Sequence, residues 1–90
     1  MELRRLDEAI SSFDKAIAIK SDYAVAHSNR GNALKDLGRF DEAIASYDNA
    51  IAVAPSYADA HSNRANTLLA LRQFEQALAR GIITLTNQAL

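Results

Sequence analysis

The chain has 90 residues, of which 49% are hydrophobic, and this composition suits one folded domain with a modest core. Its 10 basic and 11 acidic residues give a net charge of −1, so the basic footprint of a nucleic-acid-binding protein is missing. The chain contains no cysteine, which excludes disulfides and thiolate metal sites. No apolar run approaches the ~20 residues that span a bilayer, and the N-terminus does not resemble a signal peptide. We therefore expect a cytoplasmic protein that binds neither nucleic acid nor membrane.

Apolar residues recur at three- and four-residue steps along most of the chain, which predicts amphipathic helices. Gly38 can end one helix in the left-handed conformation, and Pro55 can stop the next one. We expect five helices, over about residues 6–20, 22–37, 40–54, 57–71 and 74–88. Because the connections are short, consecutive helices should pack as antiparallel neighbours in an all-α fold.

One polar block of the sequence returns after 34 residues: Ser28-Asn29-Arg30-Gly31-Asn32 reappears as Ser62-Asn63-Arg64-Ala65-Asn66. The segment that starts at Arg5 likewise returns at Arg39 and, in weaker form, at Gln73. The chain thereby resembles the tetratricopeptide repeat (TPR) family, whose pattern of small, aromatic and proline positions has this period. The residues that carry the resemblance are His27, Arg30, Gly31, Leu34, Ala43, Tyr47, Ala50 and Pro55.

The resemblance covers essentially the whole chain and implies a single TPR domain over residues 1–90. It divides the chain into half a repeat, one full repeat and a second repeat whose last helix is degenerate. A TPR-type α-solenoid is expected, in which each helix pair buries its apolar face only by stacking on its neighbours. The first helix of each pair would line the concave wall.

Asparagines recur on the side of the helices that the resemblance assigns to this wall. Their stacking in register is similar to the asparagine ladder of the O-linked N-acetylglucosamine transferase-like proteins, and it implies binding of an extended peptide. An amide group suits this ligand because it offers both a donor and an acceptor. The alternative is that these residues only keep a solvated face polar. The expected peptide-binding residues are Asn29, Asn32, Asn63, Asn66, Ser28, Ser62, Lys35, Asp36 and Asp59.

Nothing in the sequence indicates an enzyme, and no catalytic residue, metal or cofactor is expected. Nucleophile-elbow, phosphate-loop and zinc-protease motifs do not occur. His27 and His61 stand one repeat apart without a third ligand nearby, so packing explains them better than metal binding. A carboxylate clamp for a chaperone tail would need more basic charge on the concave wall.

Both ends of the chain are apolar. The first helix carries a stripe that begins at Leu6, and the last has Gly81 where earlier repeats have Phe13 and Tyr47. Apolar ends favour association. We expect a homo-oligomer with an interface formed by Leu6, Ile10, Phe13, Ile17, Leu78, Ile82, Ile83 and Leu85.

Three functions follow from these observations. The first is a non-catalytic protein–protein interaction module that binds a peptide or protein segment in its concave groove. The alternative is a self-associating scaffold whose terminal helices form the homo-oligomer. The third is an accessory repeat fragment of a larger enzyme.

Overall fold

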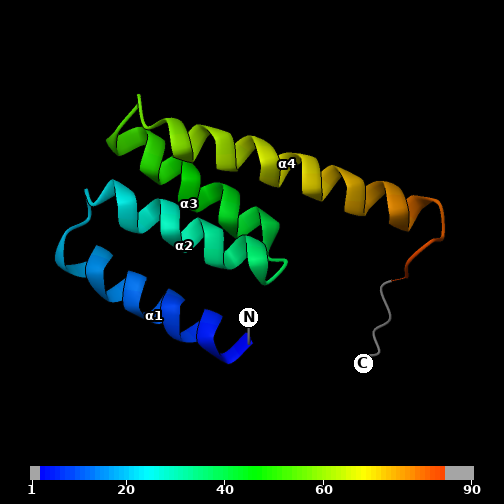
Figure 1. Ribbon diagram of the computed structural model, residues 1–90, viewed down its shortest axis with the longest axis horizontal. Coiled ribbons are helices and arrows are strands. Elements are labelled where there is room, and N and C mark those ends of the chain that lie inside the picture. Colours follow the sequence, from blue (N-terminus) through cyan, green and yellow to red (C-terminus); the bar gives the residue numbers. More distant parts are fainter. Residues whose placement is uncertain (1–2, 85–90) are drawn as a thin grey trace.

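Four antiparallel α-helices and no strand make up residues 3–84, which are the residues described by the computed structural model. The helices are α1 (Leu3–Ile19), α2 (Ala24–Asp36), α3 (Phe40–Val53) and α4 (Ala58–Ala79). Helices α2 and α4 run in one direction, and α1 and α3 run in the other (Figure 1). The all-α solenoid predicted from the repeats is confirmed.

The turn between α2 and α3 forms where the sequence predicts it. Gly38 has a φ of 80°, a left-handed conformation that favours glycine because it carries no Cβ. Its N–H donates to the carbonyl of Lys35 at 2.9 Å, and the Arg39 N–H donates to the carbonyl of Leu34 at 2.9 Å. These two bonds satisfy carbonyl groups at the end of α2 and reverse the chain.

The core lies between α1, α2 and α3. Tyr47 is fully buried, and its ring packs against the backbone of Gly31. A Cβ at Gly31 would come within 2.6 Å of Tyr47 Cε1, so this glycine allows α2 and α3 to approach closely. The buried cluster consists of Leu6, Ile10, Ala33, Leu34, Ala43 and Tyr47, with Phe13 and Leu37 packed against it.

The fourth and fifth predicted helices are one continuous helix, so the predicted break between residues 71 and 74 is wrong. The position equivalent to Gly38 is Arg72, and a residue with a Cβ pays about 1–2 kcal/mol in the left-handed conformation. The chain instead turns at Gly81, whose φ is 73°. Gly81 was expected inside a fifth helix, but its N–H donates to the carbonyl of Leu78 at 3.1 Å. Residues 85–88 of the predicted fifth helix lie outside the described residues.

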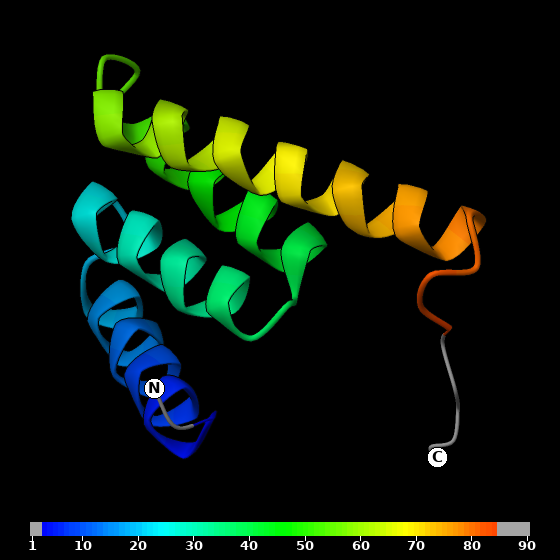
Figure 2. The same ribbon diagram turned by 45° about the vertical axis from the view of Figure 1, so that its right-hand side comes forward.

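Helix α4 therefore continues past the other helices. Its last turns extend away from α1, α2 and α3 in both ribbon views (Figures 1 and 2). Phe74 anchors this part of α4 to the start of α3, because its ring lies 6.4 Å from the ring of Phe40 at a tilt of 54°. This is an ordinary aromatic pair.

The predicted apolar stripe of α1 is largely covered. Leu6 and Ile10 are buried in the core, so Ile10 is not exposed for the predicted oligomer interface, whereas Leu6 also lines a pocket between α1 and α2. Phe13 and Ile17 are half-buried. No helix in the described range is long and apolar enough to cross a lipid bilayer.

Candidate functional site

The four asparagines of the predicted ladder lie on α2 and α4, two helices that contact each other and run in the same direction. Asn29 and Asn66 are exposed, whereas Asn32 and Asn63 are half-buried. Asp36 and Asp59 are exposed on the same two helices. We call the surface formed by Asn29, Asn32, Asp36, Asp59, Asn63 and Asn66 the asparagine strip.

Asn32 already has a partner within the protein. The hydroxyl of Tyr47 donates to Asn32 Oδ1 at 2.6 Å, which leaves the Asn32 amide hydrogens for other acceptors. Burial is the main cause that raises the pKa of the Tyr47 phenol above its ordinary value. The equivalent tyrosine is missing near Asn66, because residue 81 is glycine. The two asparagines are therefore equivalent in sequence but differ in their surroundings.

Ser28 does not belong to the strip, and its assignment to the peptide-binding site is wrong. Its exposed fraction is 1%, because the helices packed against α2 cover it. Ser62 is exposed, but it lies on the side of α4 that corresponds to the covered side of α2. Lys35 is half-buried near the end of α2.

A pocket of about 250 Å³ lies between α1 and α2, next to the asparagine strip. Asn29, Asn32 and Asp36 form its polar wall. Apolar residues of α1 and α2 form much of the remainder. The complete lining is Arg5, Leu6, Ala9, Phe13, Asn29, Asn32, Ala33 and Asp36.

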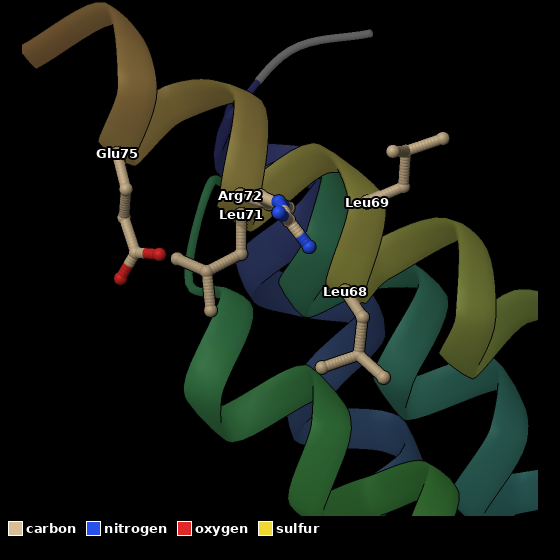
Figure 3. Close-up of a pocket in the computed structure, with 5 residues that line it drawn as sticks. All are labelled: Leu68, Leu69, Leu71, Arg72 and Glu75. Carbon is tan, nitrogen blue, oxygen red and sulfur yellow. The ribbon is translucent and has the colours of Figure 1, made fainter.

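A larger hollow of about 540 Å³ is lined by α4 alone, through Leu68, Leu69, Leu71, Arg72 and Glu75. Figure 3 shows that Leu68, Leu71 and Glu75 point to one side of α4, whereas Leu69 points to another. All five lining residues belong to α4, and Leu71 also lines a second pocket with the start of α3. The hollow is an open, largely apolar surface with one cation and one anion.

The two histidines hold the loops that precede their helices. His27 Nε2 lies 2.9 Å from the carbonyl oxygen of Ser21, and His61 Nε2 lies 2.8 Å from that of Pro55. A carbonyl only accepts, so Nε2 carries the proton in both rings. This contact supports the structural interpretation of the histidines. Among the described residues, no group of three or more His, Cys, Asp or Glu side chains is placed to hold a metal ion.

Two ion pairs were not anticipated from the sequence. Arg30 Nε donates to Asp14 Oδ1 at 2.6 Å, and Arg64 Nε donates to Asp48 Oδ1 at 2.6 Å. Each pair spans 16 residues, and the second pair repeats the first one 34 residues later. The repeated 16-residue spacing between an aspartate and an arginine was the sequence signal that could have predicted both pairs. The pairs join the second helix of one repeat to the first helix of the next.

Comparison with known proteins supports the repeat assignment. A family model of the TPR repeat matches residues 1–38 and 31–71. A search of the curated proteins finds no match for this chain. TPR repeats generally mediate protein–protein interactions, and the family is typically non-catalytic. The 34-residue period, the helix pairs of the structure and the family match together show that the chain belongs to the TPR repeat family.

Proposed function

We propose that this TPR module binds an extended segment of another protein along the asparagine strip. The observation that carries the proposal is the placement of exposed amide and carboxylate groups on two adjacent parallel helices. Asn29 and Asn66 are exposed and make no side-chain hydrogen bond within the described residues. Their amides match the donors and acceptors of a peptide backbone.

The charges of the asparagine strip favour one kind of segment. Asp36 and Asp59 are exposed, and Lys35 is next to Asp36 in the sequence. Arg30 and Arg64 follow Asn29 and Asn63 directly, but each is paired with an aspartate. Amide contacts to the ligand backbone do not read side chains, so selectivity depends on these neighbours. We therefore expect a segment with basic side chains rather than the acidic tail that a carboxylate clamp would bind.

The strip is short, and we expect weak binding. Two rungs of asparagines offer few hydrogen bonds, which corresponds to a Kd between about 1 mM and 1 μM. A peptide selected from a randomised library displayed on phage supplies the probe. Its affinity for the purified chain is measured by isothermal titration calorimetry.

Replacing Asn29 and Asn63 together by Ala should weaken binding of the selected peptide about tenfold or more, because each lost hydrogen bond contributes ~1 kcal/mol. The matched control is Asn49→Ala, since Asn49 is exposed on α3 outside the strip. A second control replaces Ile82 by Asp and Ile83 by Lys, which follow the turn at the end of α4. The proposal fails if the double asparagine change leaves the affinity unaltered, or if either control lowers it equally.

A further inference from the structure

Helix α4 exposes a face that is buried in its equivalent, α2. On α2, the residues His27, Ser28, Gly31 and Leu34 are all buried. Gly31 lies against the Tyr47 ring of α3, and Leu34 belongs to the same core cluster as Tyr47. One repeat later, the corresponding residues His61, Ser62, Ala65 and Leu68 are all exposed. Leu34 is 0% exposed and Leu68 is 41% exposed. We call this second set the α4 face.

Helix α1 carries the matching half of the contact. On α3, the residues Ala43, Ser46, Tyr47 and Ala50 are all buried. Ser46 and Tyr47 accept from and donate to side chains of α2, respectively. The residues one repeat earlier are Ala9, Ser12, Phe13 and Ala16, and each of them is half-buried or exposed. We call this set the α1 face. Each copy of the chain therefore exposes both partners of one kind of helix–helix contact, the α1 face and the α4 face.

We propose that copies of this chain associate head to tail, with the α1 face of one copy packed on the α4 face of another. The contact would repeat the packing of α3 on α2. The ring of Tyr47 lies on Gly31 within the chain, so Phe13 of the second copy would lie on Ala65.

An arginine supplies the most specific evidence. Arg30 bonds in two directions: its Nε donates to Asp14, and its Nη1 donates to Ser46 Oγ at 2.8 Å. Arg64 makes the first of these bonds, to Asp48, but within the described residues it makes no counterpart of the second. The counterpart of Ser46 is Ser12, which is exposed on the α1 face. Head-to-tail packing would give Arg64 this missing acceptor.

The charges at the edge of the contact are also complementary. Gly38 lines a pocket together with Asp41 and Glu42 at the start of α3. One repeat later Gly38 is replaced by Arg72, and one repeat earlier the two acids are Asp7 and Glu8. The same packing between two copies would place the Arg72 guanidinium against exposed carboxylates on α1. Opposite charges at a rim speed encounter and fix the register.

The pocket between α1 and α2 is filled by the same contact. Leu6, Ala9 and Phe13 line it, and their equivalents Phe40, Ala43 and Tyr47 belong to α3, the helix on which α2 packs. Helix α4 of the other copy would occupy this pocket. It would also lie beside α2, so that Asn63 and Asn66 of one copy continue the asparagine strip of the next.

The contact joins two different surfaces, so it continues from copy to copy, either as an open filament or as a ring of several copies. The methyl group of Ala65 prevents the close approach that Gly31 permits, so the helices must sit farther apart than α2 and α3. We expect weak association, with a stepwise Kd of about 10–100 μM.

Sedimentation equilibrium of the 90-residue chain between about 10 μM and 1 mM tests the proposal. The average mass should rise with concentration and pass the mass of a dimer. Ser12→Arg blocks the α1 face and Ala65→Arg blocks the α4 face, in each case at an exposed residue. Each variant alone should associate at least ~10-fold more weakly, because the new cation faces Arg64 or fills the contact. Ala45→Arg, at an exposed residue of α3 outside both faces, is the control and should assemble normally.

Mixing the two blocked variants gives the decisive result. Each retains one intact face, so together they should form a one-to-one complex that does not grow, with the stepwise Kd of the unaltered chain. Circular dichroism of each variant confirms that it is folded. Three results would each overturn the proposal: a monomer throughout the concentration range, self-association of either blocked variant as strong as that of the unaltered chain, or failure of the mixture to associate.

Discussion

Helices α2 and α4 begin with nearly the same sequence, yet their surroundings differ. The segment from His27 to Asn32 is packed between α1 and α3, whereas its copy from His61 to Asn66 contacts neighbours on one side only. After this segment α2 ends at Asp36, just before the left-handed Gly38, but α4 continues through Arg72. One residue at the turn therefore decides whether the following segment can fold back onto the helix. Local sequence repeats do not ensure that their environments repeat.

The equivalent arginines of the two repeats show the same difference at the level of single atoms. Arg30 is bonded to helices on both sides, to Asp14 on α1 and to Ser46 on α3. Arg64 is bonded to Asp48 alone within the described residues. The bond to a serine that Arg30 makes within the chain has no counterpart at Arg64 among the described residues.

Equivalent leucines provide the largest expected contrast. Leu34→Ala should lower the free energy of unfolding by about 3 kcal/mol, because it leaves a cavity in a fully buried site. Leu68→Ala should cost about 1 kcal/mol or less, since this side chain is partly solvated already. Urea denaturation of dilute protein measures both values. Equal losses would mean that a second helix covers Leu68 as α3 covers Leu34.

The hydroxyl of Tyr47 should have a smaller effect that depends on pH. Tyr47→Phe removes the bond to Asn32 and should cost about 1 kcal/mol at neutral pH. The folded-state pKa of Tyr47 is raised above its ordinary value of 10.0, so its contribution is present below that pH and is lost as the pH rises through the folded-state pKa. Unfolding measured from about pH 8 to pH 11 should therefore show a steeper alkaline loss in the unaltered chain than in Tyr47→Phe. Parallel curves would contradict this assignment.

The residue of α4 that is equivalent to Gly38 can be replaced to test why α4 continues where α2 ends. Arg72→Gly should destabilise the protein by about 1 kcal/mol, because glycine is unfavourable within a continuous helix. Amide hydrogen exchange should become faster around residues 72–79 and stay unchanged in α2. Gln73→Ala, at an exposed position next to it, is the control and should not speed exchange. If Arg72→Gly instead stabilises the chain, the helix is already broken at this position.

The smallest effects are expected from the two ion pairs between repeats. Asp14→Asn and Asp48→Asn should each cost about 0.5 kcal/mol, since both carboxylates are about half exposed. The two losses should be similar, and both should shrink in high salt. Asp41→Asn, at an exposed acid without an ion pair among those of the described residues, is the control. A difference of more than ~1 kcal/mol between the two pairs would show that their environments differ more than the geometry indicates.

The repeat pattern was sufficient to predict the solenoid and most helix boundaries. Helices α2 and α3 begin and end close to their expected bounds, because Gly38 and Pro55 act on the local backbone at the ends of these helices and the 34-residue period locates the equivalent positions. The break before Phe74 was predicted by analogy with the earlier repeat, although the glycine that makes such a turn possible is missing there. The arginine at position 72, where the earlier repeat has Gly38, is the sequence signal that predicts a continuous helix.

The site was less predictable because it depends on contacts between helices. A helical wheel places Ser28 beside Asn29 and Asn32, but it does not show that the helices packed against α2 bury Ser28. It also does not show that the Tyr47 hydroxyl binds Asn32. The burial of Leu6 and Ile10 likewise follows from the way α2 lies across α1.

The continuity of α4 underlies both the exposed α4 face and the comparison with α2, and one distance tests it directly. The chain has no cysteine, so Asp59→Cys and Arg80→Cys introduce two unique sites for spin labels at exposed positions of α4 and its C-cap. Labelled chains are diluted in excess unlabelled chain, so that only distances within one chain are measured by pulsed electron spin resonance. A continuous helix predicts a backbone separation of about 31 Å, from a rise of ~1.5 Å per residue. A distance of about half this value would show that the segment after Arg72 folds back onto α4, and it would contradict the account.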